Sequence, residues 1–236
     1  MKCSPLITVK NVSFRYDASL ILKDVELEIF PGEFIGIFGP NGGGKTTFLK
    51  LLMGILKPSR GKILFHSKTK KVRFGYVPQA SNLDKQFPIT VLELVLMGCL
   101  DELSWTGFFS KKSKQKAREA LDKVGLLSKE GAPFGTLSGG QAQRALIARA
   151  IASNPEILLL DEPTASADPE AQQEIYKLLH MLKGDDRTIL MVTHDLQAII
   201  EKVQKVLCIE RYVSTLRPAE VCKHFAMGLY HLPLMR

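Results

Sequence analysis

The sequence predicts an α/β fold with a mostly parallel sheet, an antiparallel β subdomain and an inserted α-helical subdomain. Short apolar runs at residues 34–38, 157–160 and 188–192 are typical of parallel strands that are buried on both faces. Apolar and polar residues alternate through residues 6–30, which favours a hairpin-like antiparallel region. Residues 87–152 show helical periodicity and no strong strand signal, so we expect a helical insertion there.

Chain length favours one domain with these three parts. The chain has 236 residues, which suits a single large α/β domain with a small subdomain. We expect residues 1–86 and 153–236 to form the core with its β subdomain, and residues 87–152 to form the helical subdomain. The sequence contains no internal repeat, low-complexity segment or long linker.

Composition narrows the class of protein. Apolar residues make up 45% and charged residues 24% of the chain, as in ordinary globular proteins. No apolar run approaches the roughly 18 residues needed to cross a bilayer, and residues 1–5 lack the apolar core of a signal peptide. We therefore expect the chain to stay in the cytosol. The cysteines form no C-x-x-C pair, which favours reduced packing residues over a zinc site or a disulfide framework.

The charge balance does not choose a partner by itself. The formal net charge is +8, which is compatible with an anionic nucleotide, a membrane surface or nucleic acid. The densest basic stretches are residues 68–73 and 111–116, and no nucleic-acid motif accompanies them. We interpret both as solvated positive faces and expect no nucleic-acid partner.

A glycine-rich stretch follows the apolar run at residues 34–38. Residues 39–46 fit the pattern G-x-x-x-x-G-K-[ST], and apolar residues recur at helical spacing from residue 48 to residue 53. A strand, this loop and a helix are the context in which backbone N–H groups and a helix N-terminus cradle a polyphosphate. Lys45 would reach the β- and γ-phosphates, and Thr46 would offer its hydroxyl to Mg²⁺. The alternative to a phosphate-binding loop is an ordinary glycine-rich turn before a core helix. The pattern thus predicts a P-loop NTPase core whose nucleotide-binding residues are Gly39, Pro40, Asn41, Gly42, Gly43, Gly44, Lys45, Thr46 and Thr47.

Two carboxylates end the apolar run at residues 157–160. Asp161 and Glu162 follow it directly, and ligands of open α/β sheets bind beyond the carboxyl ends of the strands. We therefore expect both side chains to face the phosphates. Asp161 would help to hold Mg²⁺, and Glu162 would orient and polarise a water that attacks the γ-phosphate.

A second glycine-rich string opens the helical pattern at residues 142–151. Ser138 is a good N-cap, and the following glycines expose backbone N–H groups at a positive helix end. The string is therefore either an ordinary capped helix or a second anion site. A nucleotide at Lys45 leaves that second site without an obvious partner in the same chain, so we expect it to face the γ-phosphate held by another copy. Its members are Ser138, Gly139, Gly140 and Gln141.

With these elements in place, the chain resembles the ATP-binding cassette (ABC) family across almost its whole length. The matching features occur in the order and spacing of that family. They are the loop at residues 39–46, Gln79, the signature string at residues 137–141, Asp161 with Glu162, Asp168 and His194. The resemblance implies ATP and Mg²⁺ as cofactors, ATP hydrolysis, and a homodimer that sandwiches ATP head to tail.

The resemblance also assigns roles that the residues alone do not suggest. Gln79 would contact Mg²⁺ or the attacking water and transmit the nucleotide state to a membrane subunit. His194 would hydrogen-bond the γ-phosphate, Asp168 would lie at the dimer interface, and Tyr16 would stack on adenine. Considered alone, Gln79, Asp168 and His194 would each be interpreted as structural or solvated residues.

Two positions depart from the family pattern. Ala167 stands where relatives usually have a bulkier apolar residue, which puts the local interface packing in doubt but not Asp168 itself. Gly43 stands where many relatives have Ser, Ala or Cys, and a glycine still permits close backbone approach.

Within the family, the chain is similar to the ATPases of zinc, manganese and related metal-ion importers. The similarity lies in residues 79–84 and 87–91 and in the pair Met97 and Gly98. It implies separate integral membrane permease subunits, an extracytoplasmic solute-binding protein acting indirectly, and a peripheral location on the cytoplasmic face of the membrane. The helical subdomain and the loop after Gln79 would form the docking surface.

Other functions stay open at this stage. Importers of chelated iron (siderophores) or haem have similar cassettes. A soluble cassette ATPase of DNA repair or of the ribosome usually carries two cassettes or a long coiled-coil insertion, and neither fits this length. A P-loop kinase or GTPase is disfavoured by the signature string at residues 137–141.

Overall fold

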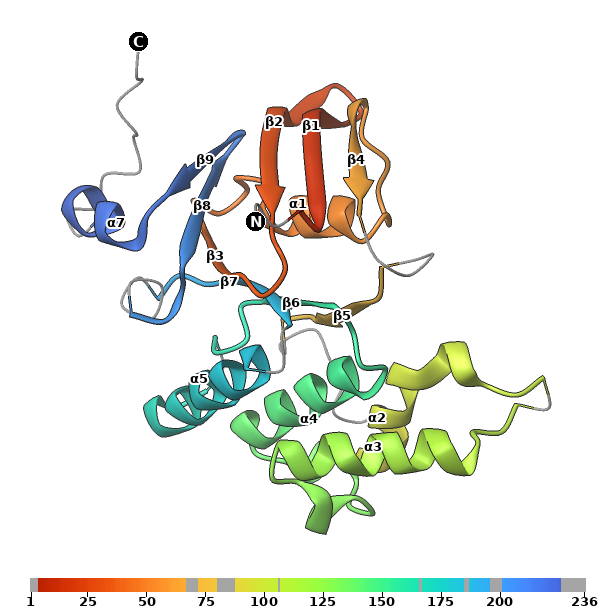
Figure 1. Cartoon of the computed structure of the whole chain (residues 1–236). Helices are drawn as coiled ribbons and strands as arrows, with labels where there is room; N and C mark the ends of the chain where they lie inside the picture. Colours follow the sequence, from red (N-terminus) through yellow and green to blue (C-terminus); the bar gives the residue numbers. More distant parts are fainter. Residues whose placement is uncertain are drawn as a thin grey trace. The chain divides into compact units, whose positions relative to one another are not determined.

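A computed structural model describes residues 4–66, 72–79, 88–105, 107–165, 167–184, 187–195 and 201–225. The chain divides into two compact units, residues 1–71 with 188–236, and residues 72–187. Figure 1 labels the elements of both units. Residues 80–87, which include most of the expected permease-docking loop, lie outside the described residues. The sequence also predicts a helix at residues 196–203, of which residues 196–200 lie outside the described residues. The expected subdomain boundaries at residues 86 and 152 stay predictions.

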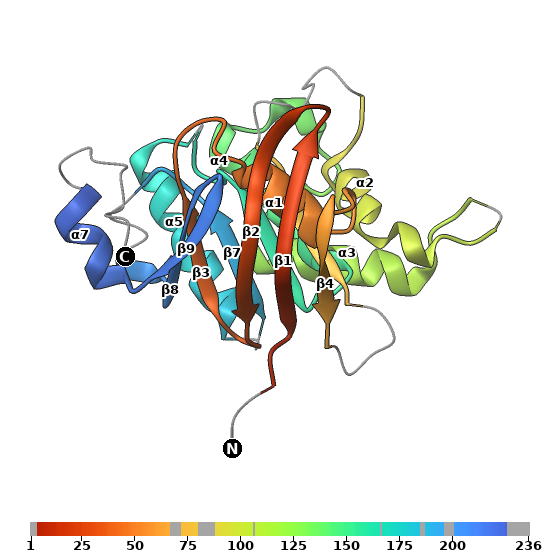
Figure 2. The same ribbon diagram turned by 90° about the horizontal axis from the view of Figure 1, so that it is seen from above.

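The first unit begins with an antiparallel sheet, as the alternating pattern predicts. Its strands are β1 (Ile7–Tyr16), β2 (Ser19–Ile29) and β4 (Arg60–Phe65), in the order β2-β1-β4. Figure 2 shows the three strands side by side. Ile7 pairs with Ile29 and is fully buried, because alternate side chains of each strand share the core face.

The same unit contains the central parallel strands. Strand β3 (Phe34–Phe38) lies between β7 (Thr188–Val192) and β8 (Lys205–Glu210) and runs parallel to both, while β9 (Tyr212–Leu216) pairs antiparallel with β8. Every residue of β3 and β7 is buried, which explains their continuous apolar sequences. Helix α1 (Lys45–Leu52) follows β3, and α7 (Pro218–Phe225) follows β9.

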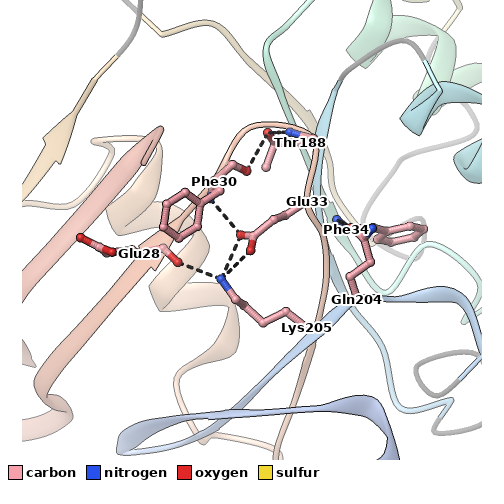
Figure 3. A network of polar contacts seen from close by, with 8 residues as sticks. Glu28, Phe30, Glu33, Phe34, Thr188, Gln204 and Lys205 are labelled. Carbon is pink, nitrogen blue, oxygen red and sulfur yellow. Dashed lines mark hydrogen bonds and ion pairs between the residues drawn. The ribbon is translucent and has the colours of Figure 1, made fainter. Parts of the chain in front are cut away.

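A polar network joins the strand starts in this unit (Figure 3). The Nζ of Lys205 lies 2.7 Å from Oε1 of Glu33 and donates to the Glu28 carbonyl at 3.0 Å. The Phe30 N–H donates to Oε2 of Glu33 at 2.9 Å, and the Phe34 N–H donates to Oε1 of Gln204 at 3.1 Å. The network therefore ties the turn between β2 and β3 to the start of β8.

The second unit places helices around a parallel strand pair. Strand β5 (Phe74–Val77) runs beside β6 (Ile157–Asp161). Helices α2, α3 and α4 pack against one another, as Figure 1 shows. Its helical elements are α2 (Val91–Leu96), η2 (Met97–Glu102), α3 (Lys111–Lys123), η3 (Leu127–Lys129), η4 (Phe134–Thr136), α4 (Gly139–Ala152) and α5 (Pro169–Lys183).

Close backbone approach explains two glycines of this unit. A Cβ at Gly98 would collide with the carbonyl oxygen of Arg149 on α4, and a Cβ at Gly75 would collide with that of Ala150. Only glycine lets η2 and β5 approach α4 this closely. Within the Met97 and Gly98 pair, Gly98 is therefore required by packing against α4.

Two kinds of feature are absent from the residues that the structure describes. Among them, no helix is long and apolar enough to cross a membrane. Within the same ranges, no group of three or more His, Cys, Asp or Glu side chains is arranged to hold a metal ion. Cys99 and Cys208 are free and buried, and burial together with Glu210 raises the pKa of the Cys208 thiol to about 11.

Candidate functional site

The glycine-rich loop joins the end of β3 to the first residue of α1. Gly42 and Gly44 have φ angles of +77° and +104°, a region that side chains strain to adopt. Gly44 is the N-cap residue of α1 and supplies no side-chain oxygen to the first turn. The positive end of α1 is thus capped only by flexible backbone, which is the arrangement that receives phosphate oxygens.

Lys45 is held within this loop. Its side chain is buried, and its Nζ donates to the carbonyl oxygens of Gly39 at 2.9 Å and Pro40 at 3.0 Å. A buried ammonium carries an electrostatic cost that further negative groups can offset. The loop therefore presents a fixed positive charge to any anion that binds against it.

The turn between β8 and β9 is hydrogen-bonded to the backbone of the glycine-rich loop. The Arg211 N–H donates to the Gly43 carbonyl at 3.3 Å, and the Arg211 carbonyl accepts from the Lys23 N–H of β2 at 2.7 Å. An added Cβ at Gly43 would lie 2.6 Å from the carbonyl oxygen of Ile209. This chain therefore has no room at Gly43 for the side chains that many ABC relatives carry there.

Two further expected residues lie in the same unit as the loop. His194 follows β7 and is exposed, and the Thr193 N–H beside it donates to the Ile37 carbonyl of β3 at 3.1 Å. Tyr16 ends β1 and is 43% exposed, with its ring perpendicular to that of Phe14 at 4.8 Å between centroids. His194 thus stands at the carboxyl edge of the strands from which the loop leaves, and Tyr16 keeps an accessible ring.

In the second unit, Gln79 and Glu162 meet. The Nε2 of Gln79 donates to Oε2 of Glu162 at 2.9 Å, and both side chains are half-buried. Glu162 directly follows β6 and has a φ of +50°, which is uncommon for a residue with a side chain. The tight backbone turn at Glu162 aims its carboxylate at the segment that follows β5.

Asp161 has a partner that sequence reasoning missed. Tyr76 lies on β5, and its hydroxyl hydrogen-bonds the Asp161 carboxylate on the neighbouring strand. Burial, then the charge of Asp161 and this hydrogen bond, raise the pKa of Tyr76 to about 12. The phenol therefore stays protonated and donates to the acid. The available signal was its place near the carboxyl end of a strand, two residues before Pro78.

The predicted N-cap of α4 is confirmed. The Gln141 N–H donates to Oγ of Ser138 at 3.3 Å, and Oε1 of Gln141 accepts from the Ser138 N–H at 3.2 Å, which completes a capping box. Ser138 itself is exposed. Gly140 is buried, and an added Cβ there would lie 2.6 Å from the Cβ of Ala171 on α5. Gly139 lies between them as the first residue of α4.

Asp168 caps the next helix. Its Oδ1 accepts from the Ala171 N–H at 2.9 Å, and Pro169 occupies the first turn of α5, where proline is favoured. The Nε2 of Gln172 donates to the Ala167 carbonyl at 3.0 Å, which fixes the segment before the helix. This cap gives Asp168 a structural role beside any interface role.

The expected residues therefore fall into two groups. The first unit holds Tyr16, the loop and His194, and the second holds Gln79, Asp161, Glu162, Asp168 and the start of α4. Within the second unit the structure joins Gln79 to Glu162 and adds Tyr76 to Asp161. The loop support from Arg211 is a further contribution that no sequence motif indicated.

These features define the class of protein to which the chain belongs. A buried strand, a left-handed glycine loop with an enclosed lysine and a following helix form the phosphate-binding arrangement of P-loop nucleotide-binding proteins. The acidic end of β6 is the second element that such ATPases require.

Comparison with known proteins identifies the family. The family model described as ABC transporter matches residues 22–165. The chain belongs to the ABC transporter family, and as its ATPase it binds and hydrolyses ATP.

Two named relatives show which kinds of transport system contain similar ATPases. The chain is 45% identical over 212 residues to the "Probable metal transport system ATP-binding protein" of Chlamydia trachomatis serovar D, covering 88% of this chain and 89% of the relative. It is 37% identical to the high-affinity zinc uptake system ATP-binding protein ZnuC of Bacillus subtilis, covering 87% of this chain and 91% of the relative.

Solved structures agree with the fold. A metal-chelate type ABC transporter in an inward-facing conformation matches with a TM-score of 0.86 and 31% identity, over 98% of this chain and 90% of that one. A dimeric bacterial ABC transporter cassette matches with a TM-score of 0.76 and 30% identity, over 90% of this chain and 98% of that one. The predicted α/β class is thereby confirmed.

Proposed function

We propose that this ATPase powers the uptake of metal ions through separate permease subunits, as a homodimer at the cytoplasmic face of the membrane. Two relatives, one named for metal transport and one for zinc uptake, match nearly nine-tenths of the chain. Their names support metal ions as the transported cargo. A solute-binding protein outside the membrane would deliver the cargo. Zinc, manganese and iron are the candidate ions, and they are cargo here, not ligands of this chain.

The proposed nucleotide site uses the loop and its neighbours. The residues present fit ATP with Mg²⁺. The glycine-rich loop and the buried Lys45 supply phosphate donors, and the carboxylate of Asp161 is a suitable cation ligand. Thr46, Gln79 and Asp161 would hold Mg²⁺, which neutralises phosphate charge when bound. Tyr16 would stack on adenine, and His194 would bond the γ-phosphate.

The observation that carries the coupling proposal is the hydrogen bond between Gln79 and Glu162. Glu162 is the proposed general base, which orients and polarises the attacking water. Gln79 immediately precedes the segment proposed to contact the permease. A 2.9 Å bond therefore links the carboxylate that acts on water to the start of that segment. Rearrangement of this bond on nucleotide binding would report the state of the site to the permease.

Replacement of Glu162 tests hydrolysis and transport together. We predict that Glu162→Gln lowers ATP turnover at least a hundredfold while nucleotide affinity stays within about threefold, because general-base catalysis contributes 10²–10⁴ in rate. Uptake of radioactive zinc or manganese by cells that carry this variant should fall to background.

The competing functions give different results in the same cells. Retained metal uptake with loss of siderophore or haem uptake would favour the chelate importers. Normal ATP turnover by Glu162→Gln would contradict the role of Glu162. Uptake that is normal for every solute, with the chain absent from washed membranes, would favour a soluble cassette ATPase.

A further inference from the structure

An exposed apolar surface occupies the connection between α2 and α3. Trp105 is 97% and Phe108 is 74% exposed, and Leu100 is 58% exposed. Three large apolar side chains are thus exposed within nine residues of the chain, and exposed apolar side chains that gather in one region are typical of interaction sites. We call the set formed by Leu100, Trp105, Phe108 and the three lysines described below the aromatic–lysine surface.

Backbone hydrogen bonds of Ser104 join described residues of the connection that carries the two aromatic side chains. The Ser104 N–H donates to the Phe108 carbonyl at 3.2 Å, and the Gly107 N–H donates to the Ser104 carbonyl at 2.9 Å. In both views the connection projects beyond α2 and α3 (Figures 1 and 2). Trp105 and Phe108 therefore belong to a segment in which Ser104 is joined to Gly107 and Phe108.

Three exposed lysines follow this segment directly. Lys111, Lys112 and Lys114 lie in the first turn of α3, which contains no acidic residue. Positive charge at a helix N-terminus opposes the helix dipole, so these lysines are not placed there for helix stability. Within the described part of the chain, no hydrogen bond or ion pair to a carboxylate holds them.

Nearby acids are largely neutralised. Glu102 pairs with Lys116 and also accepts from Ser113, and Glu130 pairs with Arg118. Asp101 at the base of the loop is exposed. The surface around the two aromatic side chains is therefore cationic.

We propose that the aromatic–lysine surface contacts the anionic lipid headgroups of the membrane. Tryptophan and phenylalanine favour the boundary between headgroups and acyl chains, and adjacent lysines are attracted to anionic lipid. An excess of positive charge beside exposed aromatic side chains suits an anionic lipid surface. This lipid contact adds detail to the proposed peripheral membrane location, and it depends on that proposal.

The chain carries its own reporter for this contact. Trp105 is the sole tryptophan of the sequence, so the emission of the full-length chain reports the environment of the loop. The nucleotide-free protein is mixed with vesicles of phosphatidylcholine, or of equal amounts of phosphatidylcholine and phosphatidylglycerol. We expect a blue shift and co-sedimentation with the mixed vesicles only, and both should weaken as salt is raised.

Variants separate the two parts of the surface. Phe108→Ser, and the triple change of Lys111, Lys112 and Lys114 to Gln, should each weaken vesicle binding at least tenfold and leave ATP turnover unchanged. Ile55→Ser, at a 64% exposed apolar residue of the first unit, is the matched apolar control. The matched charge control is Lys10→Gln with Lys57→Gln and Lys62→Gln, which should bind like the parent.

Three outcomes would overturn the lipid contact. One is an emission spectrum that neither vesicle changes, and another is equal weakening by the controls. The third is a shift with native inverted membrane vesicles but none with vesicles made from their extracted lipids, which would identify a protein partner instead. Because this assay contains no nucleotide and no permease, its failure is distinct from failure of the proposed transport function.

Discussion

Tyr76 shows how a single hydroxyl can position an acidic group. It donates from β5 to the buried Asp161, which is a proposed Mg²⁺ ligand. Groups that orient a metal ligand through a hydrogen bond typically affect metal affinity 10–100-fold. Tyr76 is therefore a positioning residue and not a catalytic one.

Removal of that hydroxyl should change the magnesium requirement. We predict that Tyr76→Phe raises the Mg²⁺ concentration for half-maximal ATP turnover about tenfold, with a smaller effect on the maximal rate. The control is Tyr176→Phe, which removes another buried hydroxyl of the same unit. An unchanged Mg²⁺ dependence in Tyr76→Phe would show that the bond is structural only.

The raised pKa of Tyr76 also gives a pH dependence of stability. The neutral phenol is favoured in the folded chain, so its contribution is complete below its ordinary pKa of 10.0 and is lost as pH rises toward about 12. Urea unfolding across this window should show a decline that is smaller in Tyr76→Phe. An equal decline in the variant would assign the loss to other groups.

Among the elements, the start of β8 depends on the polar network around Glu33 and Lys205. Both side chains are about one-fifth exposed, and Glu33 also accepts from the backbone of the turn that precedes β3. Removing one partner leaves the other charge partly buried.

We predict that Glu33→Ala lowers the free energy of unfolding by about 1–3 kcal/mol, because Lys205 and the Phe30 N–H both lose an acceptor. Arg217→Ala is the control, since its side-chain pair with Glu220 is largely exposed and should contribute little. Urea unfolding measures both variants. Equal effects would mean that the network adds no more than a surface pair.

The elements that the sequence predicted well are those with a clear period and a clear boundary. The run at residues 34–38 and the hairpin at residues 6–30 have one physical interpretation each, and the structure contains both. The first turn of helix α3 is nearly all lysine and lacks an apolar stripe, so apolar periodicity did not indicate that the helix begins at Lys111. The cap at Ser110, which accepts from the Ser113 N–H at 3.0 Å, was the overlooked signal.

Sequence patterns did not predict contacts between segments that are distant from each other in the chain. Helix α7 was not expected, although Pro218 stands at its start. The support of Gly43 by Arg211 joins residues that no motif connects. The bond of Tyr76 to Asp161 likewise depends on the register of β5 with β6, which sequence alone does not specify.

For the whole molecule, the central proposal is that the nucleotide site is complete only between two copies. Lys45 and Ser138 open two different helices, and each helix start can receive an anion. A single copy would then bind ATP but hydrolyse it poorly. A solved bacterial ABC transporter cassette that this chain resembles is itself dimeric.

The molar mass of Glu162→Gln in solution tests this proposal most directly. With ATP and Mg²⁺ we predict twice the monomer mass of 26.2 kDa, and without nucleotide the monomer mass. Adding Ser138→Arg to the same chain should restore the monomer while ATP binding persists, because the larger side chain blocks closure. A chain that stays at 26.2 kDa with ATP bound, or a dimer that survives Ser138→Arg, would contradict the shared site.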